Sequence, residues 1–213
     1  MKPTISFDLD GTLVDRSYPD AVWLQGLPRI YAKEKNIPFH TAQTFLIKEY
    51  DAVGDTNPEW YDIHYWFSRF NLTTSWQDLL DEYRHTIQVF PEVPDILRRL
   101  SKDYNLILLS NAKREFIDIE LEQSKLGQYF TYVFSSTSDF HQVKKVPLFY
   151  EKICEEIKVK PTELIHVGDH EEFDYKVPSQ LGIKSFFLDR TRTATGNHVV
   201  YDLTEFESKI TNF

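Results

Sequence analysis

Phe7-Asp8-Leu9-Asp10-Gly11-Thr12 follows directly on an apolar run that begins at Ile5, and this stretch decides the fold. Alternate residues of a strand lie on the same face, so Asp8 and Asp10 leave the strand on one side. Burying two carboxylates together costs free energy unless a cation or a bound proton compensates them. Gly11 permits a tight turn just beyond the strand. The stretch therefore predicts a strand that ends in an acidic site, rather than a turn with two solvated acids.

Short apolar runs recur along the chain, and helical patterns separate them. Each run is short enough for a buried strand, and continuous apolarity suits parallel strands covered on both faces. The alternation predicts an α/β protein with a doubly wound, Rossmann-like parallel sheet. The expected strands are Ile5 to Leu9, Leu106 to Leu109, Tyr132 to Phe134, Leu164 to Val167 and Ser185 to Leu188, and the expected helices between them are Pro94 to Leu100, Lys113 to Ser124 and Pro147 to Lys158.

Residues 16–90 carry helix signals but no convincing strand. We expect a core of residues 1–15 and 91–213, and an inserted all-helical domain of residues 16–90. Pro residues fit the start of a helix or divide one, and Ser or Thr followed by Gln can cap one. The signals are a helix divided at Pro28, a helix over Thr41 to Val53, a helix that starts near Pro58 and carries Ile63, Phe67 and Phe70, and a capping box at 74–77 that opens a helix through Tyr83.

Composition limits the kind of protein. The chain has 213 residues, of which 41% are apolar and 27% are charged, which is typical of a globular protein. Its net charge of -9 argues against general binding to nucleic acid or an anionic membrane. The single Cys leaves no intrachain disulfide, and Asp8 stands where a signal peptide needs its apolar run, so we expect a cytoplasmic location. The oligomeric state is left open between monomer and homodimer.

A second acidic group follows another expected strand. Asp169 comes directly after Gly168, and Asp174 follows five residues later. Ligands of open parallel sheets bind beyond the carboxyl ends of the strands, so Asp8, Asp10 and Asp169 are expected to converge. Carboxylate oxygens without Cys ligands favour Mg²⁺ over Zn²⁺. His166 and His170 have a zinc-compatible spacing only in a helix, and a strand through His166 excludes it.

Two further groups could contact an anion. Ser110 and Asn111 end the second expected strand, where they can cap a helix and also present donors to a phosphate. Lys144 and Lys145 precede Pro147, where two lysines usually form solvated surface.

Taken together, these residues resemble the haloacid dehalogenase superfamily, specifically phosphatase-type members with a helical cap inserted after the first motif. Residues 7–15 match the first motif along its whole length, 108–111 look like the second, and 167–169 with Asp174 look like the fourth. The third motif is degenerate: Lys144 keeps its spacing to Pro147, and we prefer it to Lys145. Phe173 stands where many relatives carry Asn.

The resemblance implies phosphoryl transfer from a small phosphorylated metabolite through an aspartyl-phosphate. Asp8 is then the nucleophile and Asp10 the general acid and base. Thr12, Ser110, Asn111 and Lys144 grip the phosphoryl oxygens, with Lys144 counted among the catalytic residues. Mg²⁺ binds Asp8, Asp10 through its backbone carbonyl, Asp169 and Asp174.

Four alternatives to this expectation are considered. True dehalogenases of the superfamily lack the second acid, so Asp10 argues for a phosphatase. A phosphomutase uses the same core and differs in how its cap admits water. A non-catalytic phosphate- or partner-binding module could keep the motifs, although the intact pair Asp8 and Asp10 weighs against it and against a receiver-type signalling domain, which would also be shorter.

Aromatic residues concentrate in the inserted segment. Residues 16–90 hold 15 of the 32 aromatic residues and all four Trp. Most of these rings are expected to build the core of a small helical domain. A few, in the cluster Trp60, Tyr61, Tyr65 and Trp66, are candidates to face the site and stack on a substrate ring.

Overall fold

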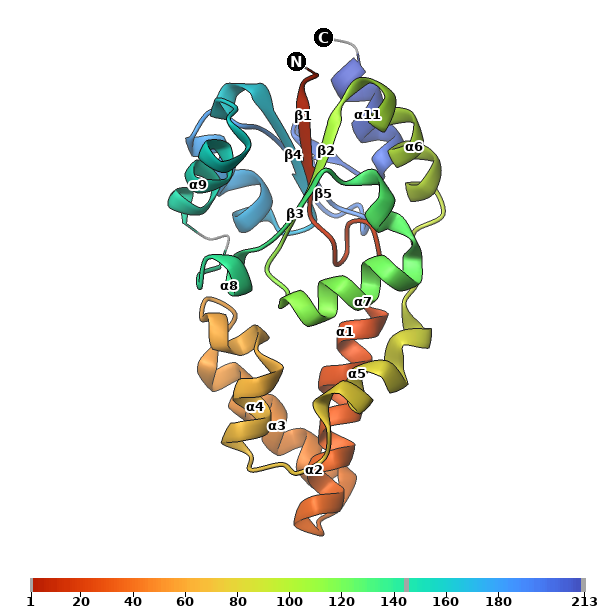
Figure 1. Ribbon diagram of the computed structural model, residues 1–213, viewed down its shortest axis with the longest axis vertical. Coiled ribbons are helices and arrows are strands. Elements are labelled where there is room, and N and C mark those ends of the chain that lie inside the picture. Colours follow the sequence, from red (N-terminus) through yellow and green to blue (C-terminus); the bar gives the residue numbers. More distant parts are fainter. Residues whose placement is uncertain (1, 144–145, 212–213) are drawn as a thin grey trace.

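A computed structural model describes residues 2–143 and 146–211. These residues form a six-stranded sheet in which every strand pair is parallel, in the order β3-β2-β1-β4-β5-β6 (Figure 1). The sequence order reverses between β1 and β4, as in doubly wound dinucleotide-binding folds. The strands are β1 (Thr4–Phe7), β2 (Asn105–Ser110), β3 (Tyr132–Ser135), β4 (Leu164–Gly168), β5 (Lys184–Leu188) and β6 (Val199–Val200).

Helices cover both faces of the sheet, which explains why its strands are continuously apolar. In β2, Leu106 and Leu108 pack on one face, and Ile107 and Leu109 pack on the other. The first face is covered by α6 (Val93–Asp103), α7 (Arg114–Ser124) and α11 (Leu203–Thr211), and the second by α9 (Pro147–Ile157) and α10 (Val177–Gln180). The remaining short segments of this part are α8 (Ser136–Asp139), η4 (Leu126–Tyr129), η5 (Pro161–Glu163) and η6 (Glu171–Lys176).

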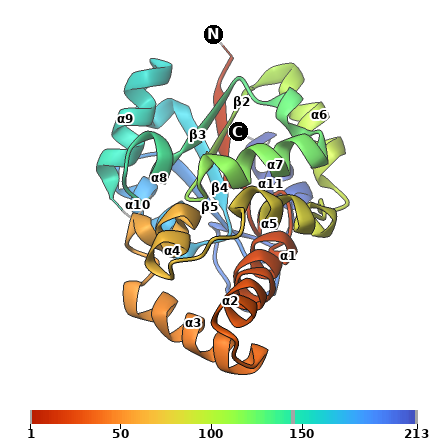
Figure 2. The ribbon, with the colours of Figure 1, turned by 60° about the horizontal axis from the view of Figure 1, so that its bottom comes forward.

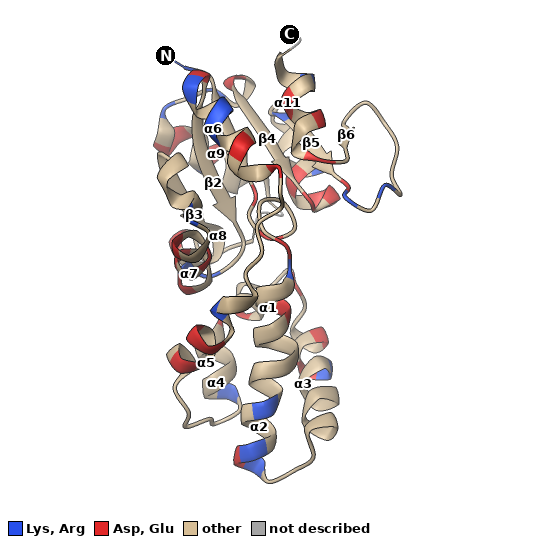
Figure 3. Cartoon of the chain, turned by 90° about the vertical axis from the view of Figure 1, so that its right-hand side faces the viewer, with Lys and Arg blue, Asp and Glu red and all other residues tan. Residues whose placement is uncertain are grey.

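Most of the chain between β1 and β2, from Ser17 to Thr86, is helical and lies beyond the carboxyl ends of the strands (Figures 1 and 2). Seen from the side, it forms an elongated lobe with Lys and Arg along α2 and acidic residues on α5 (Figure 3). Its elements are α1 (Ser17–Ala21), η1 (Val22–Gly26), α2 (Leu27–Lys35), α3 (Phe39–Val53), η2 (Pro58–Tyr61), α4 (Ile63–Arg69), α5 (Trp76–Tyr83) and η3 (Arg84–Thr86).

This helical segment has an apolar core of its own. Trp66 is fully buried there, where its ring stacks on Phe70 and meets Tyr50 edge to face. Phe116 of α7 joins the same cluster. Large rings bury much area per residue, so a small group of helices can build a core from few side chains.

Two chain crossings connect the helical segment to the sheet, and they lie side by side. Asp15 donates its backbone N–H to the carbonyl of Gln88, and Phe90 donates to the carbonyl of Leu13. Val14 and Val89 form an antiparallel bridge between the crossings. The two ends of the segment therefore leave the sheet at one place.

The structure confirms the doubly wound parallel sheet and corrects some local expectations. The two-residue strand β6 is too short to give a pattern in the sequence. Helix α5 is capped by Ser75, whose hydroxyl accepts from Asp78 N at 3.1 Å, one residue later than the expected box. Pro58 begins a 3₁₀ segment rather than α4, and a π-helical turn precedes Pro28.

No helix in the described part of the chain is both long and apolar enough to cross a lipid bilayer.

Candidate active site

Three carboxylates converge where the strand order reverses. Asp8 follows β1, Asp169 follows β4, and Asp174 lies in η6. A ligand oxygen of each lies within 4.8 Å of those of the other two. Asp8 and Asp174 are buried, and Asp169 is partly exposed. The topology thus brings together acids that are more than 150 residues apart in the sequence.

Two glycines make room for these carboxylates. Gly11 has φ +78°, and a Cβ on it would lie 2.0 Å from Asp169 Oδ2. A Cβ on Gly168 would lie 2.4 Å from Asp174 Cγ. A side chain at either position would therefore require the neighbouring carboxylate to move, and at Gly11 the backbone conformation also favours glycine.

A buried polar chain holds Asp174 in place. His166 Nε2 lies 3.1 Å from Asp174 Oδ1 and 3.2 Å from the hydroxyl of Tyr150. His166 Nδ1 lies 2.7 Å from the hydroxyl of Ser6 on β1. The backbone N–H of His170 donates to Asp174 Oδ2 at 3.0 Å. His166 lies in strand β4, as expected, and its ring contacts Asp174 of the acidic cluster.

Ser110 and Asn111 lie beside the cluster at the end of β2, and both line the central cavity. Ser110 Oγ accepts the backbone N–H of Ala112 at 3.0 Å. Asn111 Oδ1 accepts from the Ser136 hydroxyl at 2.6 Å, which turns its amide nitrogen toward the Tyr61 hydroxyl at 3.5 Å. Ser110 is thus held by the turn that follows β2, and Asn111 by side chains of α8 and of the helical segment.

The remaining expected site residues lie in different environments. Asp10 lines the same cavity as Asp8. Thr12 is fully buried and donates to Asp8 Oδ2 at 3.2 Å, so its hydroxyl contacts the carboxylate. Lys144 and Lys145 lie outside the described residues.

Two residues near the site were not predicted from the sequence. Glu120 of α7 is fully buried, and burial, followed by the charge of Asp10, raises the pKa of its carboxyl. Arg190 follows β5 and donates to the backbone carbonyls of Gly11 at 3.2 Å and Thr12 at 2.7 Å. An isolated Glu in a helix and an Arg in a loop carry no signal in one sequence.

A cavity of about 470 Å³ extends from the carboxylates to the helical segment. Asp8, Asp169 and Ser110 line it from the sheet part of the molecule. From the helical segment, aromatic and charged side chains complete the wall: Arg16, Asp20, Trp23, Tyr50, Asp55, Trp60 and Tyr61. Its volume is within the usual range for small-molecule sites.

The cluster has the donors that a hard divalent cation requires. Carboxylate oxygens are the preferred ligands of Mg²⁺, and the three candidate oxygens lie close enough to share one ion. Bringing three carboxylates this close together is costly without a cation. The residues present therefore fit a divalent metal.

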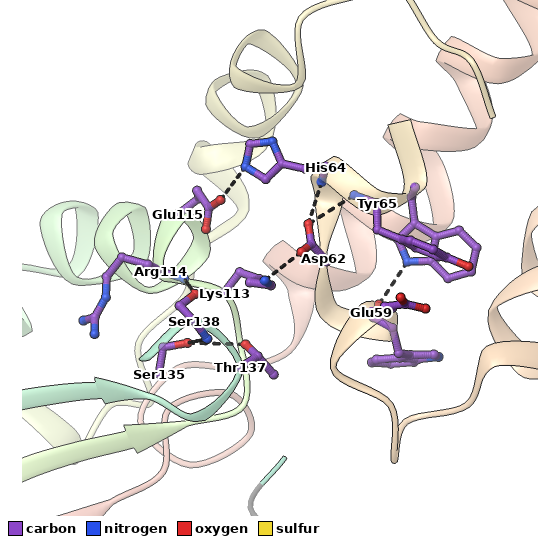
Figure 4. A network of polar contacts seen from close by, with 12 residues as sticks. Glu59, Asp62, His64, Tyr65, Lys113, Arg114, Glu115, Ser135, Thr137 and Ser138 are labelled. Carbon is purple, nitrogen blue, oxygen red and sulfur yellow. Dashed lines mark hydrogen bonds and ion pairs between the residues drawn. The ribbon is translucent and has the colours of Figure 1, made fainter. Parts of the chain in front are cut away.

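Polar contacts link the helical segment to α7 near the cavity (Figure 4). Lys113 Nζ lies 2.7 Å from Asp62 Oδ2, and His64 Nε2 lies 2.6 Å from Glu115 Oε1. Trp23 stacks on Phe116, with ring centroids 5.4 Å apart. The start of α7 and the residue before it therefore contact both η1 and the start of α4.

Comparison with known proteins agrees with this arrangement. A phosphoglycolate phosphatase from Vibrio vulnificus is 27% identical over 200 residues, which cover 86% of this chain and 82% of the relative. The pyrophosphatase PpaX of Bacillus cereus is 25% identical over 178 residues, covering 78% and 74%. A crystal structure of a HAD phosphatase from Thermococcus onnurineus has the same fold, with a TM-score of 0.86, 23% identity and coverage of 99% and 98%. The family model for haloacid dehalogenase-like hydrolases matches residues 2–182, and the chain belongs to this family.

Proposed function

We propose that the protein is a Mg²⁺-dependent phosphatase that hydrolyses a small phosphomonoester through an aspartyl-phosphate. The observation that carries the proposal is the convergence of Asp8, Asp169 and Asp174 beside a cavity that Asp10 also lines. The phosphatase names of the relatives in Vibrio vulnificus and Bacillus cereus support it.

The first chemical step is attack on phosphorus by a carboxylate oxygen of Asp8. A bond forms between this oxygen and phosphorus, and the bond from phosphorus to the alcohol oxygen breaks. Asp10 gives its proton to the departing alkoxide. The donation from the Thr12 hydroxyl to Asp8 Oδ2 fixes the orientation of the carboxylate before attack.

The second step releases phosphate. Asp10, now ionised, takes a proton from a water molecule, whose oxygen attacks phosphorus while the bond to Asp8 breaks. Asp8 returns as a carboxylate and Asp10 as an acid, so the enzyme is restored. Burial, followed by the charge of Asp10, raises the pKa of Glu120, so the neutral form of this carboxyl is favoured beside Asp10.

Side chains around the phosphoryl group stabilise its charge. Ser110 and Asn111 line the same cavity as Asp8, and their side chains are assigned to donate hydrogen bonds to the phosphoryl oxygens. Lys144 is proposed for the same role from its place in the sequence. Asp8, Asp169, Asp174 and the backbone carbonyl of Asp10 would hold Mg²⁺, which neutralises charge on the phosphoryl oxygens.

Residues 16–90 serve as a cap in this proposal. The paired crossings at 13–15 and 88–90 form the connection, and the segment contributes one wall of the cavity. Enclosure excludes bulk water and strengthens the electrostatic interactions of the site. The leaving alcohol would lie against this wall.

The test is phosphate release from a panel of phosphorylated metabolites in the presence of Mg²⁺. The proposal expects turnover of at least one member by the wild-type protein, loss of turnover on adding EDTA, and loss in Asp8→Asn. Release of no phosphate, or equal turnover in Asp8→Asn, would refute it. When a bisphosphorylated activator is added, hydrolysis should remain the reaction observed. A change from hydrolysis to isomerisation of the substrate would identify a phosphomutase.

A further inference from the structure

The cavity has an aromatic wall. We define this wall as Trp23, Tyr50, Trp60 and Tyr61 of the helical segment together with Phe116 of α7. Tyr65 and Trp66, the other members of the expected cluster, do not line the cavity among the described residues. Trp66 instead lies in the core of the helical segment.

The rings of the aromatic wall are held by specific contacts. Trp23 stacks on Phe116 with an interplanar angle of 13°, and its backbone carbonyl accepts from the Tyr50 hydroxyl at 3.3 Å. The Tyr61 hydroxyl donates to the Asp55 carbonyl at 3.1 Å, and Trp60 meets the Tyr61 ring edge to face at 4.8 Å. Rings that are fixed before binding lose little entropy when a ligand stacks on them.

Charge in this part of the cavity is balanced. Among the described lining residues, the Lys and Arg side chains are Lys113 and Arg16. Lys113 is engaged by Asp62, and the charge of Arg16 acts on Asp20, whose pKa is raised by burial and partly lowered again by Arg16. Asp20 and Asp55 also line the cavity. A second anionic group on the leaving alcohol would therefore meet carboxylates as well as cations, which disfavours a phosphorylated acid.

The geometry points to a substrate class: a phosphomonoester whose leaving alcohol carries a flat aromatic ring that stacks on the aromatic wall, such as a nucleoside monophosphate. The inference rests on the proposed phosphatase function and adds the chemistry of the leaving group. A volume of about 470 Å³ leaves room beyond the phosphoryl end for a group of this size. We assign ring recognition to Trp60, because it is a partly exposed tryptophan that lines the cavity, whereas the other tryptophan of the wall, Trp23, is already stacked on Phe116.

The test compares substrates that differ only in the ring. Uridine and guanosine monophosphates are compared with the same ribose phosphate without a base, and pyridoxal phosphate and phosphoglycolate extend the comparison. Stacking predicts a kcat/KM for the nucleotides that is roughly tenfold or more above that of ribose phosphate. Equal or higher values for ribose phosphate or phosphoglycolate would overturn the inference while leaving the phosphatase function intact. A higher kcat/KM for pyridoxal phosphate than for the nucleotides would support recognition of an aromatic ring and would place that ring close to the phosphoryl group of the substrate. Hydrolysis of no compound would refute the phosphatase function itself.

Matched tryptophan variants locate the recognition. Trp60→Leu removes the ring, and we expect the ratio of kcat/KM for nucleotide to that for ribose phosphate to fall roughly tenfold. Trp60→Phe keeps a ring and should retain most of the ratio. Trp76→Leu is the control, because Trp76 packs on His64 in the same segment and does not line the cavity among the described residues. A ratio unchanged in Trp60→Leu, or lowered equally in Trp76→Leu, would contradict the assignment.

Discussion

Lys113 Nζ lies 2.7 Å from Asp62 Oδ2, and this ion pair joins the start of α7 to the start of α4. Both side chains are largely buried, with 15% and 22% of the side chain exposed. Asp62 also caps α4, because its Oδ1 accepts from the backbone N–H groups of His64 and Tyr65. One residue therefore starts a helix and fastens it to the sheet part of the molecule.

The first prediction concerns this pair. Asp62→Asn keeps the helix cap, since Asn is also favoured there, and removes the charge; Lys113→Met keeps the aliphatic stem. A double-mutant cycle on the free energy of unfolding should give a coupling of about 1 kcal/mol at neutral pH. Urea unfolding of the four proteins measures it. A coupling of zero would show that the pair does not stabilise the fold.

The coupling should depend on pH in one direction. Burial acts to raise the pKa of Asp62, but the hydrogen bonds from Lys113 and the backbone outweigh it, and the pKa lies below its usual 3.8. A lowered folded pKa means that the contribution is complete above about pH 3.8 and is lost as the pH falls through the folded value. The coupling should therefore be constant from neutral pH to about pH 5 and shrink in stronger acid. A coupling that grows on acidification would contradict this cause.

The second prediction concerns the support beneath the metal ligands. His166→Leu leaves Asp174 without the imidazole contact, so the Mg²⁺ concentration for half-maximal activity should rise roughly 10- to 100-fold. His166→Gln offers an amide at the same place and should lose less Mg²⁺ affinity than His166→Leu. Metal titrations of hydrolysis and calorimetry check both variants, and thermal unfolding shows that they are folded. Equal metal affinity in His166→Leu would assign His166 to packing alone.

The third prediction separates the two acids of the first strand. Asp10→Asn should keep Mg²⁺ binding, because the proposed ligand is the backbone carbonyl, and should lower kcat by roughly 10²- to 10⁴-fold. Calorimetry and steady-state rates measure the two effects on one sample. Near wild-type kcat would mean that another group protonates the leaving alcohol.

The fourth prediction concerns Arg190, which holds the turn after β1. Its guanidinium also pairs with Glu92 at 2.8 Å and lies over the Phe90 ring at 3.5 Å. Arg190→Met should lower the free energy of unfolding by about 1–3 kcal/mol and reduce kcat more than it changes KM. Arg190→Lys should restore little of the lost stability, because one ammonium group cannot reproduce the several N–H donors of the planar guanidinium. Arg192→Met, on the exposed loop that follows, is the control and should match the wild type.

The sheet could be predicted from the sequence because its strands are short, continuously apolar and buried on both faces. Ile5 and Phe7 are fully buried, as the run before Asp8 indicates. The convergence of Asp8 with Asp169 follows from the same reasoning, since both acids end neighbouring parallel strands. The position of an acidic residue directly after a strand therefore predicts that the residue lies in the site.

Contacts made across the fold could not be predicted in this way. The contact of His166 with Ser6 joins residues 160 positions apart, and it depends on the register of β1 with β4. Trp23 and Tyr50 face the cavity although neither lies in a recognisable motif. Glu120 lies at a buried helix position that polarity alone would place in solvent. These outcomes depend on strand register or on the packing of helices, which the sequence of one element does not determine.

The central claim is that Asp8 becomes phosphorylated during turnover. The most direct measurement is mass spectrometry of the wild-type protein quenched in acid soon after mixing with a substrate and Mg²⁺. The account predicts one added phosphoryl group on the peptide that contains Asp8, absent when Asp8 is replaced by Asn. Steady turnover with no phosphoryl group on Asp8, or with the group on another residue, would contradict it.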